Sequence, residues 1–143
     1  MFIGEYHHTI DEKGRVAVPV KFRKELANGA VVTKGLDACL FLYPMKEWET
    51  QAVRIAGLPI TRADNRAFNR HMLSGAMDME MDKQGRVVIP DYLRKFGGIN
   101  KKVVITGLYN RIEIWDAEKW EQYKQTTEAE SNAIAERMGE LGI

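Results

Sequence analysis

Two arginines occupy the same place in two nearly identical stretches of the sequence. Arg15 ends the run Asp-Glu-Lys-Gly-Arg, and Arg86 ends the run Asp-Lys-Gln-Gly-Arg. A guanidinium group can bind a phosphate, or it can pair with O6 and N7 of guanine through two hydrogen bonds. It can equally pair with the aspartate four residues earlier, Asp11 or Asp82, and so have the structural role of stabilising the turn that contains both residues. Both uses are compatible, because an aspartate that orients the arginine leaves other guanidinium donors free.

Further basic residues surround both arginines in the sequence. Residues 11–24 carry a net charge of +3, and residues 82–102 carry a net charge of +4. Lysines and arginines that bind phosphates supply salt-dependent affinity but little sequence information. A single basic side chain of this kind can simply be solvated, as on any protein surface. The recurrence of basic residues around both arginines nevertheless favours a binding surface for DNA. The candidates for phosphate contact are Lys13, Lys21, Arg23, Lys24, Lys83, Arg94 and Lys95.

The sequence does not favour a metal site. Cys39 is the only cysteine, which excludes an intrachain disulfide and a cysteine-cluster zinc site. Its apolar neighbours predict a buried small side chain rather than a reactive thiol. His7 and His8 are adjacent on a predicted strand and therefore point to opposite faces. We expect no metal and no cofactor.

Catalysis is not indicated either. The glycine-containing turns have neither the dinucleotide-binding nor the phosphate-loop spacing. An enzyme would have to use Asp11 and Asp82 together, in a pocket that small barrels seldom provide. We therefore expect neither an enzyme nor a small-molecule substrate.

Both arginines belong to an internal repeat that covers most of the chain. Residues 11–19 match residues 82–90 at an offset of 71, and after one extra residue Trp48 matches Trp120. In each copy, Gly14 or Gly85 supplies a positive φ at a polar turn, and the preceding aspartate accepts hydrogen bonds from the turn backbone. Short β-rich runs and one turn of helix follow. Besides the strand that contains His7 and His8, the predicted strands are 16–18, 30–32 and 39–43 in the first copy, and 87–89, 103–105 and 111–115 in the second.

One copy is too small to bury a core, so the two copies are expected to interleave their strands across a pseudo-twofold axis. Helices are predicted at about 45–56, 62–73 and 117–138, on the periphery of a mainly β fold. The predicted divisions are a first module at 5–48, linking helices at 49–75, a second module at 76–120, and an acidic helix and tail at 121–143.

The repeated motifs resemble those of the MraZ family, whose members contain two tandem SpoVT-AbrB-type modules. The resemblance rests on the opening MFxGEYxHTIDxKGR, the segment GLDxCLFLYP and the second-copy motif DKQGRVxIP, and it extends over essentially the whole chain. It implies a pseudo-twofold swapped-hairpin barrel, AbrB-like and related to double-psi barrels. It also implies a transcriptional regulator that recognises short repeated DNA elements upstream of its own division and cell-wall operon.

The resemblance further implies a ring-like homo-oligomer that is associated with the bacterial nucleoid. AbrB-type modules also occur in antitoxins, which leaves an antitoxin-like protein-interaction module as the alternative. Charge is compatible with a polyanionic partner, since residues 1–112 carry 18 Lys and Arg against 12 Asp and Glu. Residues 113–143 carry 3 Lys and Arg against 8 Asp and Glu, a net charge of −5. No apolar run is long enough to span a membrane, and the single cysteine indicates a cytoplasmic location.

Overall fold

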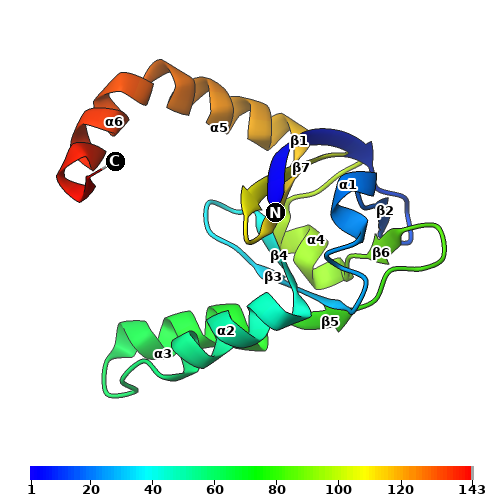
Figure 1. The fold of residues 1–143 in the computed structure, drawn as a ribbon, viewed down its shortest axis with the longest axis horizontal. Helices are drawn as coiled ribbons and strands as arrows, with labels where there is room; N and C mark the ends of the chain where they lie inside the picture. The colour runs from blue at the N-terminus through cyan, green and yellow to red at the C-terminus, as the bar shows by residue number, and fades with distance from the viewer. Residues whose placement is uncertain (143) are drawn as a thin grey trace.

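The computed structural model of the protein describes residues 1–142. A six-stranded sheet and a separate two-stranded ribbon form its body, and helices extend from it as two arms (Figure 1). All strand pairs are antiparallel. The strands are β1 (Phe2–Thr9), β2 (Arg15–Ala17), β3 (Ala30–Lys34), β4 (Leu40–Pro44), β5 (Met77–Met79), β6 (Arg86–Val88), β7 (Lys102–Tyr109) and β8 (Ile112–Asp116). The helices are α1 (Val20–Arg23), α2 (Met45–Ala56), α3 (Ala63–Asn69), α4 (Asp91–Gly97), α5 (Ala117–Ala129) and α6 (Ser131–Met138).

The strand order shows that the two repeats exchange strands. The large sheet runs β1-β7-β8-β4-β3-β5, and the ribbon is β2-β6. If β1 to β4 of the first repeat are exchanged with β5 to β8 of the second, the same strand order results, read from the opposite edge of the sheet. Each repeat therefore supplies half of the sheet and one strand of the ribbon, and the predicted interleaving is confirmed.

A closed barrel is not confirmed. Within residues 1–142 the large sheet ends at β1 on one side and at β5 on the other, and the ribbon is a separate two-stranded sheet, joined to the chain after β1 only by the single bridge between Ile10 and Val16. The two edges also differ in length, because β1 pairs with β7 over eight residues whereas β5 pairs with β3 over only three. The architecture is thus mainly sheet with several helices, built from two tandem modules.

The strands bury apolar side chains on both faces of the large sheet. On one face Leu40, Leu42 and Ile114 pack against the ribbon and the short helices, with Phe22 of α1 among the fully buried residues. On the other face a second cluster contains Phe41, Tyr43, Val104 and Trp115, together with Ile55 of α2. This alternation buries both faces of the central strands and fixes the register of the sheet.

Two helical predictions need correction. The helix predicted at 62–73 is regular only over α3 and then widens into a π-helical turn at Arg70–Ser74. The terminal helix predicted at 117–138 is broken at Glu130 into α5 and α6. Near this break the hydroxyl of Thr126 donates to the carbonyl of Gln122 at 3.1 Å, a local bond that weakens regular helix.

Cys39 is fully buried immediately before β4, as a small apolar side chain is expected to be. It lies just outside the strand that was predicted to contain it, because the turn after β3 extends through residue 39. Burial raises the pKa of its thiol far above the ordinary value. No helix among the described residues is long and apolar enough to cross a membrane.

Candidate nucleic-acid interface

The β2–β6 ribbon brings Arg15 and Arg86 together. Arg15 pairs with Val88 and Arg86 pairs with Ala17, so the two arginines lie diagonally on the outer face of the ribbon. The residue pair between them on the ribbon is Val16 and Val87. Both valine side chains point into the core, where each is 1% exposed. Both arginines line one open concavity of about 460 Å³, which also contains Asp11 and Lys101.

A tight turn holds the first arginine, and we call residues 11–15 the first corner. The Oδ1 atom of Asp11 accepts hydrogen bonds from the backbone nitrogens of Lys13 at 3.0 Å and of Arg15 at 2.8 Å. Its Oδ2 accepts one from Nε of Arg15 at 2.6 Å. The guanidinium is thereby fixed through Nε, and its two terminal nitrogens make no hydrogen bond to any other residue in the range 1–142.

The second corner, residues 82–86, repeats this geometry. Oδ1 of Asp82 accepts from the backbone nitrogens of Gln84 and Arg86, each at 2.9 Å, and Oδ2 accepts from Nε of Arg86 at 2.9 Å. The arginine side chains are 35% exposed at Arg15 and 32% exposed at Arg86, so their free ends reach solvent. The structural and the DNA-contact interpretations are therefore compatible at both corners.

The hydrogen bonds at the corners favour ionised aspartates. The backbone N–H of Arg15 holds the pKa of Asp11 below its usual range, and the guanidinium of Arg15 contributes to the same shift. The backbone N–H and the guanidinium of Arg86 lower the pKa of Asp82 in the same way. A lowered folded-state pKa means that the folded protein binds fewer protons than the unfolded chain as pH falls.

We therefore expect the corners to lose their stabilising contribution in acid. The contribution is full above the unfolded-state pKa of about 4 and disappears as pH falls through the lower folded-state values. Urea unfolding at several pH values would check this, by comparing the protein with an Asp11→Asn, Asp82→Asn double variant. The difference in unfolding free energy should shrink below about pH 4. A difference that stays constant from neutral pH into acid would contradict the assignment.

Each corner is docked on the other repeat. The backbone nitrogen of Val18 donates to the carbonyl of Gly85 at 2.9 Å, and that of Ile89 donates to the carbonyl of Gly14 at 2.7 Å. Both glycines have a positive φ, +84° at Gly14 and +75° at Gly85, which confirms the sequence prediction. Because these contacts cross between repeats, the position of each corner depends on the strand exchange.

Arg23 and Arg94 lie over these glycines rather than in open solvent. The guanidinium of Arg23 covers Gly85 and donates through Nε to the carbonyl of Val18 at 2.9 Å. The guanidinium of Arg94 covers Gly14, and its Nε is buried without a partner among the described residues. The sequence grouped both arginines with the candidates for phosphate contact, and the structure places the guanidinium of each against a corner glycine. Their matching positions in the two repeats were the only sequence signal for this placement.

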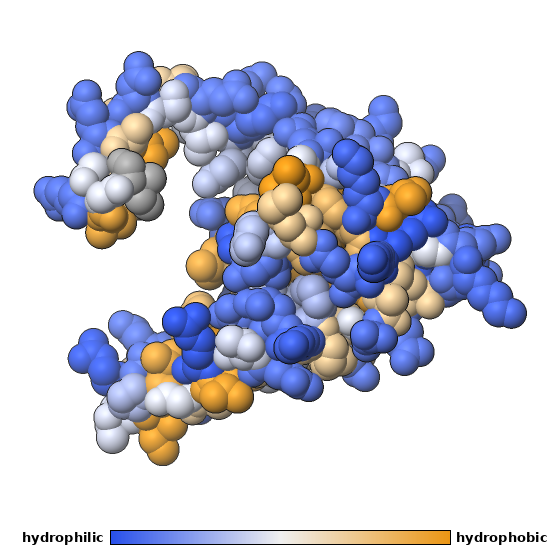
Figure 2. Space-filling view, viewed as in Figure 1, coloured by the Kyte–Doolittle hydropathy of each residue, from blue (hydrophilic) through white to orange (hydrophobic). Residues whose placement is uncertain are grey.

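The lysines around the corners are exposed. Lys13, Lys21, Lys24 and Lys83 have no ion-pair partner within residues 1–142, whereas Lys95 pairs with Asp91 at 3.1 Å. In Figure 1 the corners, next to β2 and β6, lie at the opposite end of the molecule from α3 and α6, so the acidic tail does not cover them. Figure 2 shows mostly hydrophilic residues at that end, whereas apolar residues appear on the helical arms, which flank a hollow.

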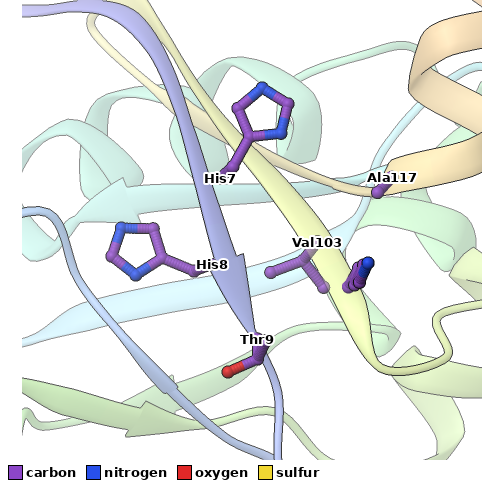
Figure 3. Close-up of a pocket in the computed structure, with 6 residues that line it drawn as sticks. His7, His8, Thr9, Val103 and Ala117 are labelled. Atoms are coloured by element: carbon purple, nitrogen blue, oxygen red, sulfur yellow. The ribbon is translucent and has the colours of Figure 1, made fainter.

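His7 and His8 lie beside a second concavity, of about 560 Å³, along β1 (Figure 3). The two imidazoles project from opposite sides of the strand, as predicted. Burial, together with the nearby charge of Arg23, lowers the pKa of His8. No cluster of three metal-binding side chains occurs in the part of the chain that the structure describes.

Comparisons with known proteins cover the full length of the chain. A family model described as "MraZ protein, putative antitoxin-like" matches residues 1–71 and again residues 72–141. Proteins named "Transcriptional regulator MraZ" from Moorella thermoacetica and Natranaerobius thermophilus are 48% and 50% identical to this chain, respectively. A protein of the same name from Clostridium tetani is 50% identical. Each comparison spans 143 residues and 100% of both sequences.

Proposed function

The chain belongs to the MraZ family, and on that basis we propose that it regulates transcription by binding double-stranded DNA through the outer face of the β2–β6 ribbon. The relatives are named for regulation of transcription, which is not an enzymatic role. The resemblance seen in the sequence is thus confirmed at the level of the family.

The pair of corners is the observation that carries the proposal. Two guanidinium groups are held on one exposed face, each fixed through Nε by an aspartate. The terminal nitrogens of each can then form the two-bond pairing with a guanine edge that a guanidinium fork permits. A two-stranded ribbon is narrow enough to enter the major groove of B-DNA. We therefore propose Arg15 and Arg86 as the base-contacting residues, with Asp11 and Asp82 as the residues that position them.

The exposed lysines would bind the flanking phosphates. Lys13, Lys21, Lys24 and Lys83 are free to do so, and Lys95 can do so by leaving Asp91. Arg23 and Arg94 act in this proposal mainly by holding the corners in place, since each covers a corner glycine.

The finer parts of the function follow from the family resemblance. We propose that the DNA elements are short repeats upstream of the protein's own gene, in a cluster for division and cell-wall synthesis, and that the protein is nucleoid-associated. We also propose a ring-like homo-oligomer. Linked subunits on linked sites gain effective concentration, so weak single contacts can combine into useful affinity. The division into modules at 5–48 and 76–120, joined by 49–75 and followed by 121–143, belongs to the same proposal.

Binding to the DNA immediately upstream of the gene tests the proposal directly. A duplex from that region and a duplex with the same composition in scrambled order would be compared by fluorescence anisotropy at two salt concentrations. We expect tighter binding to the upstream duplex at both. Equal affinity for the two duplexes would overturn sequence-specific regulation.

Removing phosphate-binding lysines should weaken binding to all sequences alike. We expect a Lys13→Ala, Lys83→Ala double variant to bind both duplexes more weakly while the ratio of their affinities stays unchanged. Each lost phosphate contact should make the plot of log K against log salt shallower by about one unit. Titration of both duplexes from low to moderate salt measures this slope. An unchanged slope would show that neither lysine contacts a phosphate.

An antitoxin-like role is the second candidate, and the description of the family model names it. The arm formed by α5 and α6 contains no buried residue and extends from the body, as a partner-binding segment would. A purified complex of fixed stoichiometry with a second protein, without affinity for the upstream duplex, would favour this role. Binding of the isolated protein to that duplex would favour the DNA-binding role.

A further inference from the structure

The two corners have the same geometry but different charges. The three hydrogen bonds that each aspartate accepts differ by at most 0.3 Å between the corners. At the second position of the turn, however, the first corner has Glu12 and the second has Lys83. Both side chains are exposed. A DNA phosphate that approaches these positions therefore meets an anion at one corner and a cation at the other.

The strand exchange strengthens this difference. Because each corner docks on the other repeat, α1 lies at the second corner, where Arg23 covers Gly85. Residues 20–24 contain Lys21, Arg23 and Lys24 and no acidic residue. The next residue, Glu25, pairs with the amino terminus of the chain. The basic corner and the basic helix thus lie on the same side.

The first corner receives the less basic helix. Arg94 of α4 covers Gly14 and also donates through Nη1 to the backbone carbonyl of Glu12 at 3.4 Å. Asp91 of the same helix lies 3.8 Å from Arg94 and 3.1 Å from Lys95, and it partly neutralises both. The first corner with α4 carries one net positive charge, whereas the second corner with residues 20–24 carries four.

We propose that the two sides of the ribbon do different work on DNA. The second corner with α1 binds the phosphate backbone and supplies most of the salt-dependent affinity. At the first corner Glu12 offsets the charge of Lys13, and on α4 Asp91 offsets that of Lys95, so that side contributes mainly through Arg15 and only weakly through phosphate binding. This inference rests on the proposed function and adds to it. It makes the two sides of each subunit unequal in phosphate binding, despite the twofold geometry of the ribbon.

A charge exchange at constant net charge tests this division. The Glu12→Lys, Lys83→Glu double variant moves the cation from the second corner to the first. If the sides are unequal, we expect it to bind a scrambled 30-base-pair duplex roughly tenfold more weakly at low salt. Its plot of log K against log salt should be shallower by about one unit. If the sides are equivalent, its affinity and slope will equal those of the unaltered protein, which would overturn the inference.

Lys24 and Lys95 provide a matched pair, because they occupy equivalent positions after an offset of 71. Lys24→Gln should weaken binding several-fold, and Lys95→Gln should change it little. Equal losses from the two variants would contradict the inference even if the exchange variant binds weakly. Circular dichroism would establish that all variants are folded.

The outcome also separates this inference from the proposed function. Failure of the unaltered protein to prefer the upstream duplex over the scrambled one would contradict the proposed function. Preference by the unaltered protein, combined with equal effects on the two sides, would contradict only the asymmetry.

Discussion

Replacing Arg15 or Arg86 by alanine is expected to remove most of the preference for the upstream DNA while the protein stays folded. A good two-bond contact between a guanidinium and guanine contributes about 1–3 kcal/mol of discrimination, which corresponds to roughly a 5- to 150-fold loss in affinity for the specific duplex. In an oligomer bound to several repeats the losses combine, so the measured effect should be larger. Affinity for the scrambled duplex should fall much less.

The fold should tolerate either substitution. Oδ1 of Asp11 would still accept hydrogen bonds from the backbone of Lys13 and of residue 15, so the turn keeps two of its three bonds to that aspartate. The arginine side chain is 35% exposed, and its removal leaves no cavity in the core. Circular dichroism and urea unfolding should therefore differ little from those of the unaltered protein.

Arg15→Lys and Arg86→Lys are the controls that separate charge from geometry. Lysine keeps the positive charge but lacks the planar fork that pairs with guanine. These variants should keep the affinity for scrambled DNA and lose the preference for the upstream duplex. Alanine variants that keep the full ratio of specific to non-specific affinity would refute base contact by the corners. Lysine variants that keep it would show that the arginines contribute charge alone.

The repeat made much of this structure predictable from sequence. Gly14 and Gly85 could be assigned a positive φ, and Asp11 and Asp82 a turn-capping role, because local chemistry decides both. The interleaving of strands followed from the small size of one repeat. The pairing of β2 with β6, which places Arg15 and Arg86 on one face, agrees with that expectation.

Features that depend on distant contacts were not predictable. Arg23 and Arg94 look like solvated cations in sequence, and only the exchange of strands places each over a glycine of the other repeat. The full length of β1 was missed because its pairing with β7 joins residues about 100 positions apart. The break at Glu130 was missed because the tail reads as one helical run. Its two helices have no buried residue whose packing would keep them in one line.

The corner glycines should be sensitive to substitution, and Gly14 more so than Gly85. A Cβ at either position is strained because φ is positive, at a cost of roughly 1–3 kcal/mol. At Gly14 the new carbon would lie 2.5 Å from the backbone oxygen of Ile89, whose position is held by the hydrogen bond from the nitrogen of Ile89 to the carbonyl of Gly14. At Gly85 the nearest atoms, at 2.4 Å, belong to the guanidinium end of Arg23, which can swing away.

We therefore expect Gly14→Ala to destabilise the protein by about 3 kcal/mol or more and Gly85→Ala by about 1–2 kcal/mol. Urea unfolding measures both. Because Gly85→Ala displaces Arg23 from its bond to Val18, it should also loosen the second corner and weaken DNA binding in spite of its smaller effect on stability. Equal destabilisation by the two corner variants would show that the carbonyl of Ile89 yields as easily as the side chain of Arg23, and that the corners are less rigidly docked than their hydrogen bonds indicate.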